Sequence, residues 1–257
     1  MQATLTVLGS GTSVGVPTIA CDCAVCRSSD PRDRRTRPSV MVSYNGRHVL
    51  IDTTPDFREQ ALRENITQLD AVLYTHTHAD HILGIDDLRP LSYKHRPGKL
   101  PLYATPRDGE FLRKMFGYIF EPAYKFGGLP QVDLHSIDGP VELFGASFEP
   151  LTVIHGEMPI LGFRFGSAAY LTDHSEIPAE TLEKLRDLDI LFLDALRHQP
   201  HPTHSTVERS LKIVEDVKPK RTFFTHICHD LQHEATNAAL PPGVQMAFDG
   251  MKLEFEI

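Results

Sequence analysis

The densest group of metal-binding side chains in this sequence lies in the stretch YTHTHADHILGIDD, residues 74–87. The residues before it, LDAVLYT, form an apolar run that is typical of a buried β-strand. The chain is therefore expected to leave a strand at Thr75 and to enter a helix near Ile82, with a short loop between the two. Four ligand-type residues fall at six consecutive positions of this loop: His76, His78, Asp80 and His81.

This loop predicts two metal ions. Alternate residues of a loop can face a common point, so His76 and His78 are expected to share one ion. Asp80 and His81 lie a step further along and are expected to face a second ion beside the first, about 3.5–4 Å away. A single histidine on a loop is usually an ordinary surface residue, but four ligand-type residues in so short a run favour metal binding.

The remaining ligands are expected at the ends of three other strands. His155 follows the run FEPLTVI, Asp173 follows AAYLT, and His226 follows RTFFT. Each of these taken alone can instead satisfy buried backbone groups. With the loop they complete two ligand sets bridged by the carboxylate of Asp173. The first set is His76, His78 and His155, and the second is Asp80, His81 and His226.

A second candidate metal site lies near the amino terminus, in the run CDCAVC. Cys21, Cys23 and Cys26 are spaced too tightly for a disulfide framework, so they indicate metal binding rather than packing or reactive thiols. Three thiolates supply three corners of a tetrahedral zinc site. His229, Cys228 and His233 are the rival fourth ligands.

Length and charge limit the classes of protein that remain. The 257 residues suit one domain, expected to span residues 1–257, and the formal charge of -8 disfavours long nucleic acids as partners. A local basic run is expected first as a solvated loop and second as a phosphate-binding site: Arg32, Arg34, Arg35 and Arg37. The sequence opens without a signal-peptide pattern and has no long apolar run, so a cytoplasmic protein without membrane contact is expected.

The pattern of strands and helices predicts the α/β class, with the reactive groups at strand ends. Strands are expected at 3–10, 39–44, 47–54, 69–75, 189–195 and 221–227, and helices at 56–65, 179–190 and 206–217. The second helix would place Leu182, Leu185 and Leu188 on one face. The segment 94–130 has no clean period and is the best candidate for a substrate-side insertion or a partner surface.

The motifs THTHADH, LIDTTPD, VIHG, LTDHS and FFTHI together resemble those of the metallo-β-lactamase fold family over essentially the whole chain. This resemblance implies a four-layer αβ/βα sandwich with a dinuclear metal centre at the sheet edges. It also implies that Asp52 is a buried acid that orients the histidine loop through hydrogen bonds, rather than a ligand. In the cysteine site, the resemblance favours His229 as the fourth ligand of a structural zinc ion.

The cysteine cluster narrows the resemblance to the branch of phosphodiesterases that open phosphoribosyl 1,2-cyclic phosphate. Two zinc or manganese ions would then lower the pKa of a bridging water, which attacks phosphorus and releases a phosphomonoester. His204, in the motif HST, would act as general acid. Asp80 would be both a metal ligand and a catalytic residue. His198 and His201 are expected to be solvated, and His174 to lie outside the ligand set.

Other functions remain open from the sequence. A tRNA 3′-processing endonuclease shares the metal chemistry but normally needs a basic arm, and a glyoxalase II-type thioesterase needs neither the cysteine cluster nor His204. A relative that binds metal without turnover is the non-enzymatic alternative. The exact small-molecule substrate, the native active-site metal, iron included, and a homodimer, which the resemblance allows, are left undecided.

Overall fold

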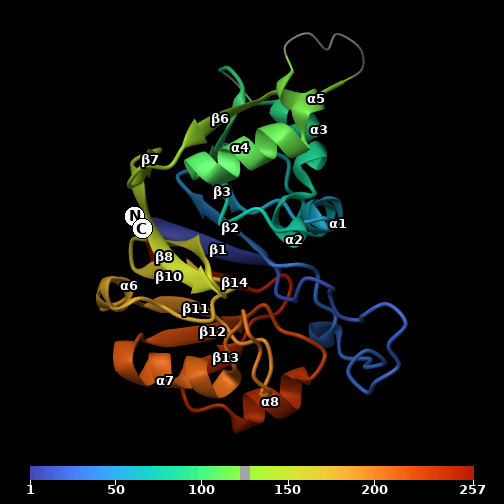
Figure 1. The fold of residues 1–257 in the computed structure, drawn as a ribbon, viewed down its shortest axis with the longest axis vertical. Helices are drawn as coiled ribbons and strands as arrows, with labels where there is room; N and C mark the ends of the chain where they lie inside the picture. The colour runs from blue at the N-terminus through green and yellow to red at the C-terminus, as the bar shows by residue number, and fades with distance from the viewer. Residues whose placement is uncertain (96, 122–127) are drawn as a thin grey trace.

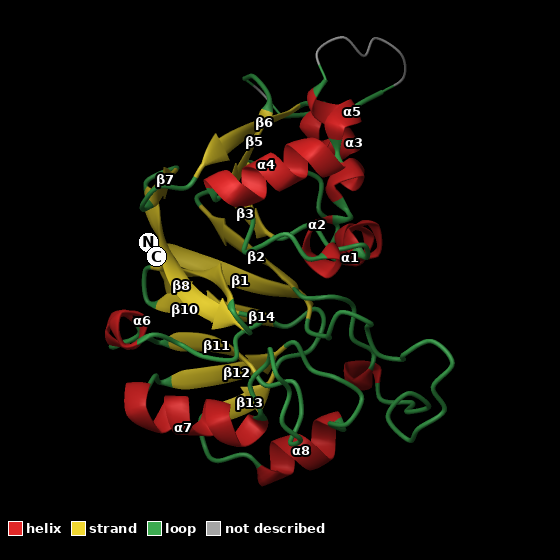
Figure 2. Ribbon diagram, viewed as in Figure 1, coloured by secondary structure: helices red, strands yellow, loops and turns green. Residues whose placement is uncertain are grey.

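Two seven-stranded sheets form the centre of the molecule. The computed structural model describes residues 1–95, 97–121 and 128–257. The first sheet has the order β14-β1-β2-β3-β4-β5-β6 and the second the order β13-β12-β11-β10-β9-β8-β7. Figures 1 and 2 show helices α1–α5 on the outer side of the first sheet and helices α6–α8 on the outer side of the second. The predicted four-layer metallo-β-lactamase sandwich is therefore confirmed.

The first sheet is built mainly from the amino-terminal half of the chain, closed by the last strand. Its strands β3 and β4 run parallel, and β4, β5 and β6 continue in the same direction. The strands are β1 (Gln2–Gly9), β2 (Ser39–Tyr44), β3 (Arg47–Ile51), β4 (Ala71–Leu73), β5 (Leu100–Ala104), β6 (Val132–Ser136) and β14 (Lys252–Glu256).

The second sheet carries the carboxyl-terminal half. Strands β10, β11, β12 and β13 are parallel, whereas β8 and β9 form a long antiparallel hairpin beside them. The strands are β7 (Val141–Leu143), β8 (Ala146–His155), β9 (Met158–Phe165), β10 (Ala168–Leu171), β11 (Ile190–Asp194), β12 (Arg221–Thr225) and β13 (Val244–Met246).

Eight α-helices in the described ranges cover the two sheets, and most are short. They are α1 (Phe57–Arg63), α2 (Ala79–Ile82), α3 (Arg89–Ser92), α4 (Pro106–Met115), α5 (Gly117–Phe120), α6 (Ala179–Lys184), α7 (Val207–Val217) and α8 (His233–Ala239). Within these ranges no helix has the length and apolar character needed to span a membrane.

Three apolar layers hold the sandwich together. The layer between the sheets contains Phe148, Phe163 and Phe192. A second layer lies between the first sheet and its helices, and a third between the second sheet and its helices. Buried strands with apolar residues on both faces explain the apolar runs in the sequence, because each sheet is covered on both sides.

The structure corrects two predictions about the elements. The helix expected at 179–190 ends at Lys184, and Asp187 adopts a positive φ of 60° that turns the chain into β11. Leu185 and Leu188 are buried nonetheless. The segment 94–130 is more regular than expected, because it supplies β5 to the first sheet and α4 to the helices that cover this sheet. Residues 96 and 122–127 of this segment lie outside the described ranges.

Candidate metal centre

Strand direction brings the predicted ligands to one edge of the sandwich. β8 and β10 are both antiparallel to β9, and β11 and β12 are parallel to β10, so these four strands end at the same edge. His155 is the last residue of β8, Asp173 follows β10, and His226 follows β12. Across the sandwich, the Leu161 N–H donates to the Thr75 carbonyl at 3.0 Å, which holds the end of β4 against the second sheet.

The first ligand group consists of His76, His78 and His155, as predicted. Their candidate ligand atoms all lie within 4.8 Å of one another. The ring centroids of His76 and His78 are 4.6 Å apart, and those of His78 and His155 are 5.0 Å apart. His76 and His155 are buried, whereas His78 is more open to solvent. Three imidazoles in this arrangement can bind one divalent ion and leave a coordination position open on the solvent side.

The second group consists of Asp80, His81, Asp173 and His226, all buried. His226 Nε2 lies 3.2 Å from Asp173 Oδ2 and 3.5 Å from Asp80 Oδ2. His81 Nε2 lies 3.4 Å from Asp173 Oδ1. Asp173 also approaches the first group, because its Oδ2 is 3.9 Å from His76 Nε2. The carboxylate of Asp173 therefore lies between the two groups, where the sequence placed the bridging ligand.

Asp80 and His81 reach the site from a helix rather than from the loop that was expected. They lie in the short helix α2, which begins at Ala79. Gly84, just after α2, allows the helix to approach the turn after β3, since a Cβ there would lie 2.0 Å from the Thr54 carbonyl oxygen. The Thr53 N–H also donates to the His81 carbonyl at 2.8 Å. These contacts fix His81 from its backbone side.

Unpaired polar atoms show that the two groups fit metal ions. Within the described ranges, His76 Nε2, His81 Nε2, His226 Nε2 and Asp80 Oδ2 are buried and have no hydrogen-bond partner. A buried unpaired polar atom costs about 1–3 kcal/mol, and several of them facing one another need a common partner. Two cations among these atoms would satisfy them all.

The charges at the site point the same way. Burial raises the pKa of Asp173, but His226 and His81 outweigh it and hold that pKa well below its usual range, so Asp173 stays ionised. Burial lowers the pKa of His76 well below its ordinary value and keeps the ring neutral. Although burial lowers the pKa of His226, Asp173 and Asp80 raise it to about 9, so in the metal-free protein this ring keeps a proton that a cation between the same carboxylates would displace. Ionised carboxylates and neutral imidazoles are the forms that bind divalent metals.

Asp52 supports the histidine loop through hydrogen bonds, as predicted. It is fully buried after β3, and its Oδ2 lies 2.7 Å from His81 Nδ1. Its carboxylate also accepts from the Thr75 N–H at 2.8 Å and from the Thr75 hydroxyl at 2.7 Å. The same hydroxyl lies 3.0 Å from His76 Nδ1. Asp52 therefore orients one histidine of each group while staying outside both.

Asp52→Asn is expected to weaken active-site metal binding by about 10–100-fold, the usual effect of removing a group that orients a metal ligand. The amide would bring an N–H toward donors that now meet a carboxylate. Metal titration by calorimetry measures the change. Asp70→Asn is the matched control, because Asp70 is a buried acid before β4 that binds Arg47 and the His48 N–H. Equal metal affinity in wild type and Asp52→Asn would contradict the assignment.

His204 and Asp194 form a pair beside the two groups. His204 Nδ1 lies 2.6 Å from Asp194 Oδ2, and the His204 ring stacks on His226 with centroids 4.5 Å apart. Sequence reasoning placed His204 but missed Asp194, which ends the apolar strand β11 just as Asp52 follows β3. An acid at the end of an apolar strand was the sequence signal that could have identified Asp194. His174 is fully buried beside this pair, and burial lowers its pKa to about 3.

His198 and His201 differ in their relation to His204: His198 is exposed, whereas His201 is half-buried with its ring centroid 5.0 Å from that of His204. His198 is exposed and pairs with Glu208, with His198 Nδ1 2.5 Å from Glu208 Oε1. His201 Nδ1 lies 3.2 Å from the Thr203 hydroxyl, within its own loop. The expectation of a solvated residue therefore holds for His198 and is wrong for His201, which packs beside His204.

The cysteine cluster meets His229, which closes the candidate structural site. His229 Nδ1 lies 3.2 Å from the sulfur of Cys21 and 3.5 Å from those of Cys23 and Cys26. Ligands of a tetrahedral zinc ion lie about 3.5 Å from one another, given Zn–S and Zn–N bonds of about 2.3 and 2.0 Å. The backbone N–H of Cys26 lowers the pKa of Cys23 to about 6, which favours a thiolate there.

The rival fourth ligands lie elsewhere. The Cys228 sulfur accepts from the Asp230 N–H at 3.4 Å, and His233 Nε2 lies 2.9 Å from the Asn237 amide nitrogen. Neither residue joins the group formed by the three cysteines and His229. The geometry therefore favours the fourth ligand that the resemblance implied.

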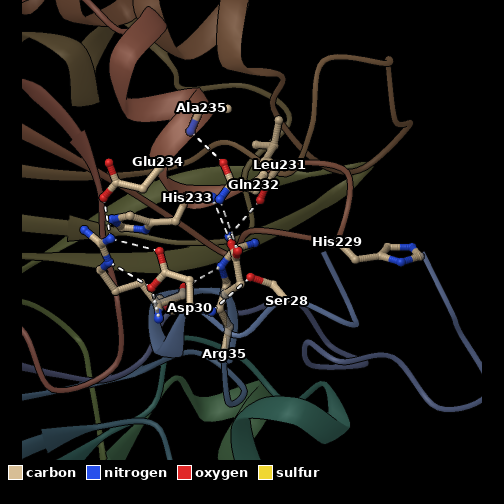
Figure 3. A network of polar contacts seen from close by, with 12 residues as sticks. Ser28, Asp30, Arg35, His229, Leu231, Gln232, His233, Glu234 and Ala235 are labelled. Carbon is tan, nitrogen blue, oxygen red and sulfur yellow. Dashed lines mark hydrogen bonds and ion pairs between the residues drawn. The ribbon is translucent and has the colours of Figure 1, made fainter. Parts of the chain in front are cut away.

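The prediction of a solvated basic run is wrong for Arg35. Its side chain is fully buried and forms an ion pair with the buried Asp33 at 2.9 Å. The guanidinium also donates to the carbonyls of Cys228 at 2.8 Å and Leu231 at 2.7 Å. Figure 3 shows Arg35 within this network, beside the segment that runs from His229 to α8. Arg35 thus ties the amino-terminal loop to the loop that carries His226 and His229.

Two cavities border the first ligand group. One has a volume of about 740 Å³ and is lined by residues that include His78, His155, Met158 and Thr203. The other, of about 560 Å³, is lined by residues that include His78, Arg107, Phe111 and Met158. A further cavity of about 390 Å³ lies against α8, and its lining includes none of the residues in the two ligand groups. Small molecules can therefore reach the metal centre at His78.

Comparisons with known proteins agree with this geometry. The model of the beta-lactamase superfamily domain matches residues 47–227. A solved structure described as a new diphosphatase from the PhnP family is 62% identical, with a TM-score of 0.94 and coverage of 99% of this chain and 98% of that one. Zn²⁺-bound PqqB from Methylobacterium extorquens shares the fold at 20% identity and a TM-score of 0.79, over 97% of this chain and 99% of that one.

A curated relative from Porphyromonas gingivalis strain ATCC BAA-308 / W83 carries the name octanoyltransferase. It is 39% identical over 251 residues, which are 96% of this chain and 50% of that protein. The chain thus spans about half of the length of this relative.

Proposed function

This chain belongs to the PhnP family within the beta-lactamase superfamily, and we propose that it is a metal-dependent hydrolase that cleaves phosphate diesters of small molecules. The convergence of the two ligand groups on the carboxylate of Asp173 carries the proposal. An intact set of seven ligand-type side chains favours turnover over metal binding alone.

Each part of the site has a role in this chemistry. His76, His78 and His155 would hold one metal ion, Asp80, His81 and His226 the other, and Asp173 both. When bound, such a pair supplies Lewis acidity, which lowers the pKa of water and offsets charge on the phosphate oxygens. Asp194 fixes the His204 ring through Nδ1, which leaves the other ring nitrogen to give a proton to the departing oxygen.

Two substrate classes fit this reaction. The sequence motifs resemble those of enzymes that open cyclic phosphodiesters such as phosphoribosyl 1,2-cyclic phosphate. The structure that is 62% identical is described as a diphosphatase, which favours a diphosphate. We propose one with a substituent on each phosphate, because each of its phosphorus atoms is then a diester. In both classes the attacked phosphorus has two oxygen substituents besides its unesterified oxygens, so one metal centre can serve either.

His204→Gln is expected to lower kcat by about 10²–10⁴-fold with little change in metal content, because the general acid is lost while the ligands remain. Steady-state kinetics and metal analysis on the same preparation measure the two effects. His198→Gln is the matched control, since His198 lies in the same loop but is exposed and pairs with Glu208. A loss of less than tenfold in His204→Gln would rule out the general-acid role.

A substrate screen tests the proposed function. Zinc-loaded and manganese-loaded protein would be assayed with a cyclic phosphodiester, a dinucleoside diphosphate, bis-(p-nitrophenyl) phosphate, a precursor tRNA and an octanoyl thioester. We expect turnover of small phosphate diesters and none of the tRNA, in keeping with the formal charge of -8. Faster cleavage of the thioester than of every phosphate diester would overturn the proposal in favour of acyl chemistry.

A further inference from the structure

Building on the proposed function, we infer that Arg107 binds the phosphate that is not attacked in a disubstituted diphosphate, while the two substituents occupy the two cavities beside His78. The substrate class is therefore a diphosphate with a substituent at each end, rather than a cyclic phosphodiester. The inference starts from the shape of the region outside the metal ligands and from the charges that line it.

The two cavities meet at one place. Their linings share His78, Arg107 and Met158, so both open beside the same metal ligand. Their volumes of about 740 and 560 Å³ each lie in the usual range for small-molecule sites, about 300–1,000 Å³. A cyclic phosphodiester such as phosphoribosyl 1,2-cyclic phosphate carries all of its phosphates on one sugar ring, so it has a single arm and would leave one cavity unused. A molecule with an arm on each side of its phosphates would fill both.

The Arg107 guanidinium has N–H donors beside the shared edge of the two cavities that are free to bind a ligand. It is the second residue of α4, and its side chain is 54% exposed. Within residues 1–95, 97–121 and 128–257, its two polar contacts, with Asp108 Oδ1 and with the Pro159 carbonyl, are both long at 3.4 Å. The Asp108 carboxylate is held more closely by the Thr105 hydroxyl at 2.7 Å. A guanidinium with weak partners can bind two oxygens of a phosphate at once.

The other residues that line the two cavities indicate the chemistry of the two substituents, one arm of the substrate in each cavity. Glu157 lines the first cavity, so further negative charge on that arm is disfavoured. In the second cavity Lys114 offsets Glu110, and Asp108 is buried, so this lining favours no net charge on the other arm. Phe111 is a large apolar side chain that is 44% exposed in the second cavity. An exposed ring beside a phosphate site suits stacking with a planar group such as a nucleobase. Uncharged, nucleoside-like substituents match these features.

The bond changes follow from this placement. The oxygen of water forms a bond to the attacked phosphorus, and the bond from that phosphorus to the bridging oxygen breaks. The departing phosphate monoester keeps the bridging oxygen and takes a proton from His204, while the attacking water releases one proton to solvent, from which His204 is protonated again. Two phosphate monoesters result, with no other reactant. Arg107 offsets the charge that develops on the departing phosphate, a charge that a diester of a single phosphate does not place there.

Kinetics on two substrates test the assignment. For Arg107→Gln, we expect kcat/KM to fall by about 10–100-fold with a dinucleoside diphosphate and by less than about twofold with bis-(p-nitrophenyl) phosphate, because only the first has a second phosphate. Arg107→Lys should restore part of the loss. Arg113→Gln is the matched control, since Arg113 lies on the same helix, donates to the Leu134 carbonyl and lines neither cavity.

A binding measurement separates this inference from the proposed function. A methylene-bridged analogue of the dinucleoside diphosphate cannot be hydrolysed at its bridge, and its binding to metal-depleted protein can be followed by calorimetry. Weaker binding to Arg107→Gln than to wild type supports the Arg107 site, even if turnover of every phosphate diester is absent and the proposed function fails. Equal losses with both substrates, or hydrolysis of cyclic phosphodiesters alone, overturn the inference and leave the hydrolase intact.

Discussion

Asp173→Asn is expected to reduce the metal content from about three ions per chain to about one, and to lower hydrolysis of phosphate diesters by about 10³-fold or more. Asp173 is the carboxylate shared by the two ligand groups, with oxygens 3.4 Å from His81 Nε2 and 3.2 Å from His226 Nε2. Removing its charge leaves two cations close together without the anion between them. Elemental analysis after dialysis, with kinetics on the same sample, measures both effects.

The backbone at Asp173 calls for a matched control. Asp173 has a positive φ of 54°, a conformation that Asn tolerates almost as well as Asp, so the substitution adds little strain. Asp187→Asn tests the same change at a φ of 60° away from the metal centre, and its metal content and activity should match wild type. If Asp173→Asn keeps about three ions per chain, the shared carboxylate is not a metal ligand.

Cys26→Ser is expected to release one tightly bound zinc ion and to lower the free energy of unfolding on the order of 4 kcal/mol, since loss of a structural metal is among the largest single-residue effects. For a chain of this size the melting temperature should fall by roughly 10 °C. The cysteines and His229 join two distant parts of the chain, and the second part also carries His226. Zinc analysis and thermal unfolding measure the change, and activity should fall as His226 loses support.

Cys228→Ser provides the comparison for this variant. Cys228 is the remaining cysteine, is buried next to His229 and lies outside the candidate zinc group. It should keep its full zinc content and lose little stability. A Cys26→Ser protein that retains all of its zinc and melts at the wild-type temperature would show that the cysteine cluster is not a structural metal site.

Local spacing made part of the site predictable from the sequence. His76, His78, Asp80 and His81 are neighbours in the chain, so their clustering needs no knowledge of the fold. His155 and His226 were placed because each stands at the end of an apolar strand, where parallel strands bring their carboxyl ends together. Asp52 has a similar position, but its role was implied by the family resemblance. Asp194 has the same signal, but no motif distinguished it from an ordinary strand end.

Other features depend on contacts between distant residues, which spacing does not encode. Arg35 looks like one member of a basic run, yet its partners include carbonyls 193 and 196 residues away in the sequence. Its burial follows from the docking of the amino-terminal loop beside α8. The helix predicted at 179–190 has helical spacing throughout, but it ends at Lys184, and pairing of β11 with β10 and β12 takes its last residue, Ile190, into a strand.

The sequence also did not predict the backbone conformation at the metal centre. Asp52, Asp173 and His226 all adopt positive φ, at 67°, 54° and 57°. Such conformations cost about 1–3 kcal/mol each in non-glycine residues and persist where surrounding contacts impose them. Asp52 and His226 directly follow β3 and β12, and Asp173 lies two residues past the end of β10. The left-handed turn at each position lets the side chain point back toward the shared edge. Asp and His are among the non-glycine residues enriched at positive φ, but many other Asp and His residues in the chain do not adopt it, so residue type alone did not locate these turns.

Anomalous X-ray diffraction from crystals of metal-loaded protein would locate the ions directly. We expect two peaks about 3.5–4 Å apart. One should lie among His76, His78 and His155, and the other among Asp80, His81 and His226, with Asp173 between them. A third peak should lie among the three cysteines and His229. A single peak or none at the histidine and aspartate groups, in protein that hydrolyses phosphate diesters, would contradict the dinuclear centre.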